Sequence, residues 1–196
     1  MPERSQYFQA AIERFDAANA QDPARVGGEP AELVYARRMT EWLDRLYPNA
    51  GEILHLAARA QHIQRWMIPR NKYPITRIGY HKWRTSLYSF HADKAGEILR
   101  EVGYDDQTIA RVRSLLRKEK IKADPEMQIL EDVVCLVFLE NYFADFAPKH
   151  DEEKVIGILR RTWKKMSDRG HSAAMSLQLP TEAQLLIEKA LSPSEN

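Results

Sequence analysis

The chain has 196 residues, which suits one domain, and 44% of them are hydrophobic, enough to bury a core without covalent staples. Its single cysteine excludes an internal disulfide framework and indicates a reducing compartment, so we expect a cytoplasmic protein. The N-terminal segment lacks the apolar stretch of a secretory signal, and the longest apolar run, Val133 to Leu139, is too short to cross a bilayer. We therefore expect no membrane partner. The net charge of +1 does not by itself indicate any partner.

Helical periodicity dominates the whole chain and no strand is predicted. The expected fold is all-α, a single compact domain of about eight helices, with residues 1–49 as an N-terminal helical pair packing on the core, 50–190 as the core and 191–196 as a tail. In chain order, the predicted helices run from Ser5 through Phe15, Pro30 to Leu46, Ala50 to Trp66, Tyr80 to Val102, Asp105 to Leu116, Pro125 through Leu139, Asp151 to Lys165, and onward from Thr181. Gly103 should end its helix in a left-handed cap, and Asp124 before Pro125 should begin the next but one.

Charge is distributed unevenly along the chain. From Ile53 to Ala92 there is no Asp or Glu, although acids make up about one residue in seven of the sequence. The same stretch carries seven cations and four histidines: Arg59, Arg65, Arg70, Lys72, Arg77, Lys82, Arg84, His55, His62, His81 and His91. A second basic cluster follows at Arg111, Arg113, Arg117, Lys118, Lys120 and Lys122. This asymmetry indicates an anionic partner, whereas the alternative is that the arginines pair with acids from other helices.

The third predicted helix concentrates polar chemistry on one face. His55, Arg59, His62 and Trp66 are spaced four, three and four residues apart. Such a stripe makes a poor apolar core and suits the wall of a polar cavity. The alternative is a partly exposed face with one buried, hydrogen-bonded histidine.

Two further helices add candidate residues. Arg84 and His91 are seven residues apart and share a face of the fourth helix. Asp132 directly precedes the apolar run of the sixth helix, so its carboxylate should be buried and needs a partner. That partner could be a metal ion, several donors, or an arginine such as Arg59 or Arg84. Cys135 fits best as a buried hydrophobic residue.

The loop from Pro69 to Tyr80 is basic and contains tyrosines, and arginine forks of this kind bind phosphate in bidentate fashion. The candidate residues for binding an anion or substrate are Arg59, Arg70, Tyr73, Arg77, Tyr80, Arg84 and Lys118. The chain has no Walker, GxGxxG, HExxH, paired CxxC or GxSxG motif, which excludes nucleotide-loop kinases, zincins, zinc fingers and serine hydrolases.

Three segments of the chain resemble one known family. They are HLAARAQHIQRWMIPRNKYPITRIGYHKWRTSLYSFHADKAGEIL, VGYDDQTIARVRSLLRKEKIKADPEMQILEDVVCLVFLENYF and ILRRTWKKMS. The chain strongly resembles the domain of unknown function 4202 from about Gly51 to Pro180. That resemblance implies no activity.

A weaker similarity is to the HD-domain metal-dependent phosphohydrolases, which would make 50–190 an HD-like helical core. In that family a histidine, a His-Asp pair and a distant aspartate hold divalent metals. The similarity implies His62, His91 and Asp132 as ligands of Mn, Fe, Zn, Ni or Mg, with His55 or Glu131 able to complete the site. The residue after His91 is Ala92 where the family has aspartate, which leaves an altered or lost metal site as an equal alternative.

Three functions follow from these residues. The first is a metal-dependent hydrolase acting on a small phosphorylated or otherwise anionic metabolite or nucleotide, whose catalytic residues the sequence does not identify. The second is a non-catalytic protein that binds a small anionic ligand at a degenerate metal site. The third and least favoured is RNA binding. The oligomeric state is left open, and a homodimer is compatible with the sequence.

Overall fold

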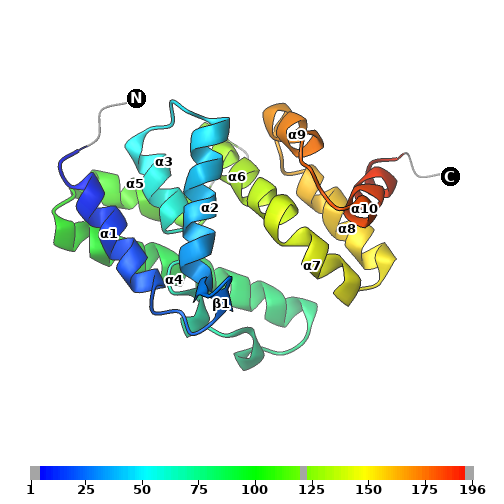
Figure 1. Cartoon of the computed structure of the whole chain (residues 1–196). Helices are drawn as coiled ribbons and strands as arrows, with labels where there is room; N and C mark the ends of the chain where they lie inside the picture. The colour runs from blue at the N-terminus through cyan, green and yellow to red at the C-terminus, as the bar shows by residue number, and fades with distance from the viewer. Residues whose placement is uncertain (1–4, 120–122, 193–196) are drawn as a thin grey trace. The chain divides into compact units, whose positions relative to one another are not determined.

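Helices form nearly all of the secondary structure in the computed structural model of the chain, which confirms the all-α prediction (Figure 1). The structure describes residues 5–119 and 123–192. Residues 193–196 of the predicted tail, and Lys120 and Lys122 of the second basic cluster, therefore lie outside the described residues. The chain divides into two compact units, residues 1–130 and 131–196, and we describe each by itself.

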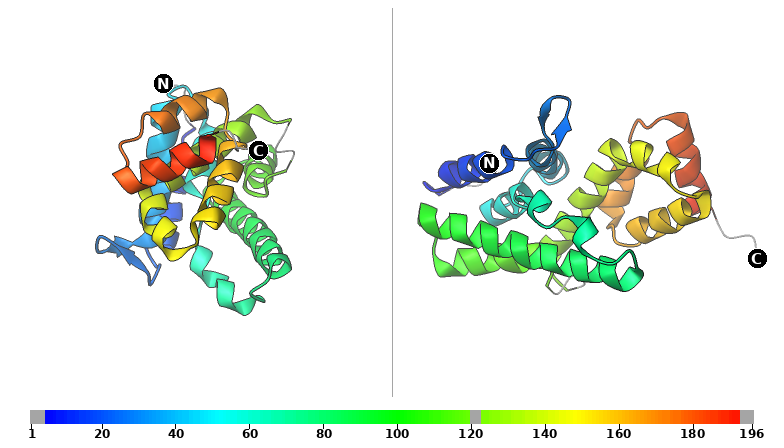
Figure 2. Two further views of the ribbon diagram at one scale, coloured as in Figure 1. Left: turned by 90° about the vertical axis from the view of Figure 1, so that its right-hand side faces the viewer. Right: turned by 90° about the horizontal axis from the view of Figure 1, so that it is seen from below.

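The N-terminal unit is a group of packed helices. Its elements are α1 (Phe8–Asn19), β1 (Arg25–Val26), β2 (Glu29–Pro30), α2 (Ala31–Leu46), α3 (Glu52–Arg59), the 3-10 helices η1 (Arg65–Met67) and η2 (Arg70–Lys72), α4 (Arg77–Val102), α5 (Asp106–Leu116) and the start of α6 (Pro125–Asn141). Helix α4 runs beside α5, α2 packs against α3, and α1 contacts both α3 and α4 (Figure 2, right). The buried side chains at these contacts include Phe15, Met39, Leu43, Leu56 and Leu99.

Helix boundaries set by local caps agree with the sequence. Gly103 has a φ of 108° and ends α4 in the left-handed conformation that glycine adopts without strain. The Asp105 carboxylate accepts a hydrogen bond from the Thr108 backbone N–H at 2.8 Å and caps α5. Helix α4 begins at Arg77, earlier than the predicted Tyr80, because the Thr76 hydroxyl accepts from the Gly79 N–H at 3.0 Å.

The third helix is shorter than predicted. It ends at Arg59, and the following residues form turns that lead into η1. Gln64 adopts a left-handed φ of 50°, and its backbone N–H donates to the Asn19 side chain at 3.0 Å. The predicted stripe of four polar residues on one helix face is therefore wrong, because His62 and Trp66 lie beyond the end of α3.

Within residues 5–119 and 123–192, the segment between α1 and α2 contradicts the prediction of no strand. Strands β1 and β2 pair antiparallel over two residues each, with Arg25 opposite Pro30. Gly27 and Gly28 both have positive φ and form the turn between them, as a two-residue hairpin requires.

The C-terminal unit holds the rest of α6 and five more helical segments. These are α7 (Phe143–Phe146), the 3-10 helix η3 (Ala147–Lys149), α8 (Glu152–Trp163), α9 (Asp168–Met175) and α10 (Thr181–Leu191). Helix α10 packs against α8 and α7 (Figure 1). Helices α7 and α9 were not predicted, so the described residues contain ten α-helices instead of about eight. Among the described residues, no helix combines the length and the apolar character that a membrane span needs.

Candidate functional site

Two of the predicted histidines lie side by side in the N-terminal unit. The imidazole rings of His62, in the turn after α3, and His91, on α4, have centroids 5.9 Å apart. Glu32 of α2 lies 3.4 Å from His62, and the charges of three cations act on the His62 ring. We call this group the histidine cluster, and its members are Glu32, His62, Arg65, Arg84, His91 and Lys118.

His91 is buried, with 2% of its surface exposed. Its Nδ1 lies 2.9 Å from the Ile63 carbonyl oxygen, and because a carbonyl only accepts, Nδ1 carries the proton. Nε2 is then a lone-pair acceptor, and it has no hydrogen-bond partner among the described residues. Burial, followed by the neighbouring His62, lowers the pKa of His91 from 6.5 to about 3, so the ring is neutral at physiological pH.

His62 is the more accessible of the two rings, with 24% of its side chain exposed. It stacks on Tyr35 of α2 at a centroid distance of 4.0 Å and an interplanar angle of 11°. Its Nδ1 lies 3.4 Å from Glu32 Oε2, at the long end of hydrogen-bonding distance. Burial, and then the positive charge of Arg65, hold the pKa of His62 well below its usual value. Both rings therefore serve as neutral imidazoles.

Glu32 is the one acid of the cluster, and 15% of its side chain is exposed. The pKa of Glu32 is raised from 4.5 to about 7, chiefly by burial and also by the charge of Asp22, against the lowering effect of Arg65. The Asp22 carboxylate is fixed beside it, because Oδ2 accepts from the Glu32 backbone N–H at 2.9 Å. At neutral pH Glu32 therefore contributes only part of a negative charge.

The three cations are held against aromatic rings. The Arg65 guanidinium lies 5.1 Å from the centroid of the Trp83 ring. The Arg84 guanidinium and the Lys118 ammonium lie 5.4 Å and 5.6 Å from the same ring, that of Tyr88. Each of the three positive charges lowers the pKa of His62, which shows that their fields converge on that ring.

The backbone is unusual at two places in this cluster. Gln64, directly before Arg65, has a φ of 50°, and Lys118 has a φ of 58°. They are the non-glycine residues with positive φ in the described parts of the chain. Such conformations cost free energy and occur often at functional sites.

The arginines of the second basic cluster have carboxylate partners instead. Arg111 is bound by Asp124 and Glu126, with Nε 2.8 Å from Glu126 Oε2, and these contacts raise its pKa. Arg113 and Arg117 both contact Asp93, Arg117 at 2.8 Å. We call this group the arginine–carboxylate network, and its members are Asp93, Arg111, Arg113, Arg117, Asp124 and Glu126. The alternative that arginines pair with acids from other helices is correct here, which weakens the argument for RNA binding.

Two residues of the predicted stripe are likewise paired within the unit. His55 Nε2 lies 2.8 Å from Asp44, and its Nδ1 lies 2.9 Å from the Gly51 carbonyl oxygen. Arg59 donates from Nε and Nη2 to the Asp16 carboxylate at 2.7 and 2.6 Å. Both side chains tie α3 to neighbouring helices.

Asp132 is fully buried in the C-terminal unit, as predicted. Its carboxylate accepts from the Ser167 backbone N–H at 2.8 Å and from the Ser167 hydroxyl at 2.5 Å. The approach of Gly170 is so close that an added Cβ there would lie 2.8 Å from Asp132 Oδ1. Asp132 therefore fixes the start of α9. The prediction considered several donors as one partner, and Ser167 supplies two of them.

The basic loop contributes local structure. Arg70 donates to the carbonyl oxygens of Tyr73 and Pro74 at 2.8 and 2.9 Å. Tyr80 is 42% exposed, and Arg84 lies 5.8 Å from its ring centroid. Arg77 is exposed at the first turn of α4. Of the predicted anion-binding residues, Arg84 and Lys118 belong to the histidine cluster, and Tyr80 borders it.

The described residues contain no group of three or more His, Cys, Asp or Glu side chains arranged to hold a metal ion. The structure brings His62 and His91 together, whereas His55 hydrogen-bonds to Asp44 and to the Gly51 carbonyl oxygen and Asp132 accepts from Ser167. A metal ion at His62 and His91 therefore stays a prediction.

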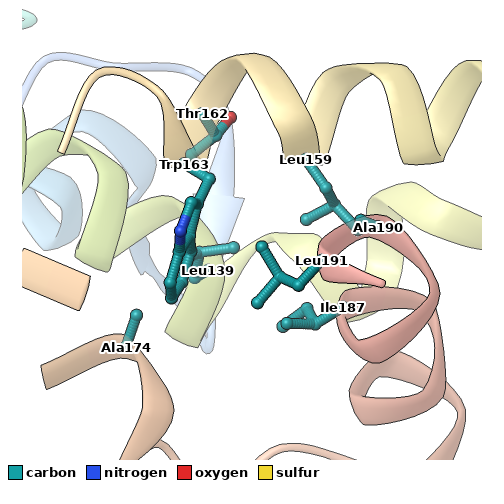
Figure 3. A pocket seen from close by; sticks show the side chains of 8 residues that line it. All are labelled: Leu139, Leu159, Thr162, Trp163, Ala174, Ile187, Ala190 and Leu191. Atoms are coloured by element: carbon teal, nitrogen blue, oxygen red, sulfur yellow. The ribbon is translucent and has the colours of Figure 1, made fainter. Parts of the chain in front are cut away.

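A small hollow lies within the C-terminal unit, between α8 and α10 (Figure 3). Its volume is about 10 Å³, which is close to the minimum for one water molecule. Its lining is apolar except for Thr162, and the Trp163 ring forms one wall beside Leu139 (Figure 3). Cys135, which lies in α6 with the lining residue Leu139, is buried as predicted. Its Sγ is 3.9 Å from the Thr162 carbonyl oxygen. This hollow offers no charged group and is a packing defect of the apolar core.

Glu32 and Arg65 are the members of the cluster that were not among the candidate site residues. Arg65 stood in the acid-free basic stretch, which was a usable signal. Glu32 lies in the first turn of a helix, where acids are common because they complement the helix dipole, so its sequence context carried no signal for a site.

Comparison with known proteins adds one finding. A family model described as "Domain of unknown function (DUF4202)" matches residues 9–187. No curated protein and no solved structure shows a significant match. The match confirms the stronger of the two resemblances, and the similarity to HD-domain phosphohydrolases stays a prediction.

Proposed function

The chain belongs to the DUF4202 family, and we propose that its histidine cluster binds a small phosphorylated or otherwise anionic molecule. The observation that carries this proposal is the convergence of Arg65, Arg84 and Lys118 on the neutral ring of His62. Three positive charges act on one partly accessible ring, which stabilises a negative charge placed beside it.

The charge balance of the cluster favours an anion over a free cation. Both imidazoles are neutral at physiological pH, and the one carboxylate, Glu32, titrates near pH 7. Glu32 and its neighbour Asp22 supply the negative charge of the group, and Arg65, Arg84 and Lys118 supply its positive charge. A phosphate or sulfate group would neutralise much of that charge.

His91 indicates a second chemical group that the ligand should carry, a hydrogen-bond donor. Its Nε2 is a buried acceptor without a partner among the described residues, and such an atom needs a hydrogen-bond donor. A phosphate monoester in its monoanionic form, or a sugar hydroxyl beside a phosphate, supplies both a negative charge and an O–H donor. The ligand we propose therefore carries both groups.

The backbone around the cluster supports a binding role. Positive φ at Gln64 fixes the position of the following Arg65, and positive φ at Lys118 occurs at a ligand-facing residue in this proposal. Strain of this kind persists where the surrounding structure enforces it, and it commonly serves to pre-organise a site.

A metal-dependent hydrolase is the second candidate, and one observation favours it. A histidine whose Nδ1–H donates to a backbone carbonyl, leaving Nε2 open, is arranged like the metal-binding histidines of known sites. A divalent ion at His62 and His91 would supply a Lewis acid for hydrolysis of a phosphate ester, while Arg65 would hold the phosphate. Elemental analysis of protein purified without a metal-affinity tag tests this candidate, and metal at one equivalent would support it.

The primary proposal is tested by calorimetric titration of the full chain with inorganic phosphate and with a phosphorylated sugar. We expect Arg65→Met to weaken binding tenfold or more, because one charged hydrogen bond is worth about 1.5–3 kcal/mol. The matched control is Arg117→Met, which removes an arginine of the network and should leave affinity unchanged. Absence of binding by the unaltered chain, or equal losses in both variants, would overturn the proposal.

A further inference from the structure

The segment from the end of η1 through the first turn of α4 displays apolar side chains to solvent. We call Met67 to Tyr80 the anchor loop. Ile75 is 97% exposed, Ile78 is 71% exposed and Met67 is 57% exposed. In Figures 1 and 2 (left) this turquoise segment extends below the helices of the N-terminal unit. Single exposed apolar residues are common, but several within one short loop indicate an interaction surface.

The loop is held in one conformation by its own contacts. Arg70 ties the carbonyl oxygens of Tyr73 and Pro74, and the Trp83 indole N–H donates to the Ile68 carbonyl oxygen at 2.8 Å. Gly79 lies so close to Pro74 that an added Cβ would be 2.2 Å from the Pro74 carbonyl oxygen. The isoleucines therefore project from a preformed loop, and binding through them costs little ordering entropy.

The charged side chains of the anchor loop and of the helix turn that follows it all have one sign. Lys72, Arg77 and Lys82 are exposed within or beside the loop. No Asp or Glu occurs between Ile53 and Ala92, so the loop itself offers no acid to offset them. An apolar tip within a basic ring is complementary to a surface that is apolar inside and anionic outside.

We propose that the anchor loop docks the protein on an anionic lipid surface, with Ile75 and Ile78 entering the boundary between headgroups and acyl chains. Lys72, Arg77 and Lys82 then contact lipid phosphates and carboxylates. This docking is peripheral and needs no spanning helix. It departs from the expectation of no membrane partner, which rested on the lack of a spanning segment, and it does not depend on the function of the histidine cluster.

Nucleic acid is the weaker fit for this surface. Aromatic side chains and arginine forks carry most binding to single strands, because they stack on bases and bind phosphates. Ile75 and Ile78 gain nothing from a phosphate backbone, yet they are the most exposed apolar residues of the loop. A lipid surface accommodates them without needing a shaped pocket.

The test is co-sedimentation of the full chain with vesicles of phosphatidylcholine alone and of phosphatidylcholine mixed with phosphatidylserine. We expect binding to the mixed vesicles that weakens as salt rises. The double variant I75S/I78S should partition at least tenfold less, because each isoleucine buried in lipid contributes roughly a tenfold gain. Both residues are exposed, so the fold should be unchanged by circular dichroism.

Matched controls separate the loop from general surface effects. The double variant M175S/L185S removes two exposed apolar residues of the C-terminal unit, at 65% and 51% exposure, and should bind as the unaltered chain does. K72Q/R77Q should lose binding to the mixed vesicles, whereas K154Q/K164Q should not. Failure to bind mixed vesicles, equal binding by I75S/I78S, or retention of RNA in place of vesicles would each overturn the proposal.

Discussion

The histidine cluster and the arginine–carboxylate network lie in the same unit and draw on the same kinds of residue, yet their charges are arranged in opposite ways. In the network each arginine contacts a carboxylate, and Asp124 also accepts from the Glu126 backbone N–H at 3.1 Å at the start of α6. In the histidine cluster three cations surround two rings that cannot carry charge at neutral pH and an acid whose ionisation is opposed by burial. The network joins elements through paired charges, whereas the cluster brings three cations close to a ring that stays neutral.

Charges that stabilise the fold and charges that serve a ligand should therefore respond differently to substitution. Substitution of a charged residue that stabilises the fold should lower the free energy of unfolding. A group of charges that binds a ligand is in an unfavourable arrangement when the ligand is absent. Some substitutions in such a group should therefore raise the free energy of unfolding. The two groups therefore predict opposite signs for similar substitutions.

The largest effect is expected for Glu32→Gln. The folded-state pKa of about 7 lies above the ordinary 4.5, so between these values the folded state keeps a proton that the unfolded state has lost. The contribution of Glu32 to stability is therefore complete below pH 4.5 and falls as the pH rises through about 7. Glutamine cannot ionise, so at pH 8 the variant should be about 2–3 kcal/mol more stable than the unaltered chain.

Urea unfolding at pH 4 and pH 8, followed by tryptophan fluorescence, checks this expectation. The gain should be near zero at pH 4. Glu126→Gln serves as the matched control from the network, and it should lower stability by about 1 kcal/mol. Destabilisation of Glu32→Gln at both pH values would mean that Glu32 belongs to the structural class.

Arg111→Met should have the next largest effect, with the opposite sign. It leaves Asp124 and Glu126 without their shared partner, and Asp124 is 14% exposed. We expect a loss of about 1–2 kcal/mol in the free energy of unfolding and no change in phosphate binding. Arg100→Met is the control, because its partner Asp106 is 3.7 Å away and highly exposed, and its loss should stay within about 0.5 kcal/mol. Weaker phosphate binding by Arg111→Met would erase the distinction between the two groups.

Lys118→Met tests the role of one cation of the histidine cluster. Removing this charge should raise the pKa of His62, because Lys118 is one of the cations that lower it. Phosphate affinity should fall roughly fivefold, as expected for one charge near a protein surface. Nuclear magnetic resonance titration of the His62 ring measures the first effect and calorimetry the second. Lys94→Met, which removes a lysine paired with Glu97, should change neither.

How much of the molecule the sequence predicts depends on whether the signal is local. The boundaries at Gly103, Asp105 and Pro125 were predicted because each follows from the conformational preference of one or two residues. The early end of α3 was not predicted, because it depends on the Asn19 side chain, which belongs to α1 and is distant in sequence.

The candidate site residues likewise divide into those with a local signal in the sequence and those that depend on contacts distant in sequence. The acid-free stretch placed His62 and His91 among cations along the sequence, since charge composition is visible without a fold, and the anionic partner that it indicates stays a prediction. The burial of Asp132 was predicted from its place before an apolar run, but Ser167 was not, because the helix that it begins was missed. Glu32 lies beside His62 because of how α2 packs in the folded unit, and no local sequence pattern reveals that packing.

The smallest effect tests the strained turn that places Arg65. Gln64→Gly should stabilise the chain by about 0.5–1 kcal/mol, because glycine adopts a positive φ without the cost that glutamine bears. The control is Gln184→Gly within α10, where helical φ makes glycine unfavourable by about 1 kcal/mol. Phosphate binding should weaken slightly in Gln64→Gly, since a freer turn holds Arg65 less firmly. If the variant were less stable than the unaltered chain, glutamine would bear no conformational cost at this positive φ. The turn would then provide no evidence that the cluster is pre-organised for a ligand.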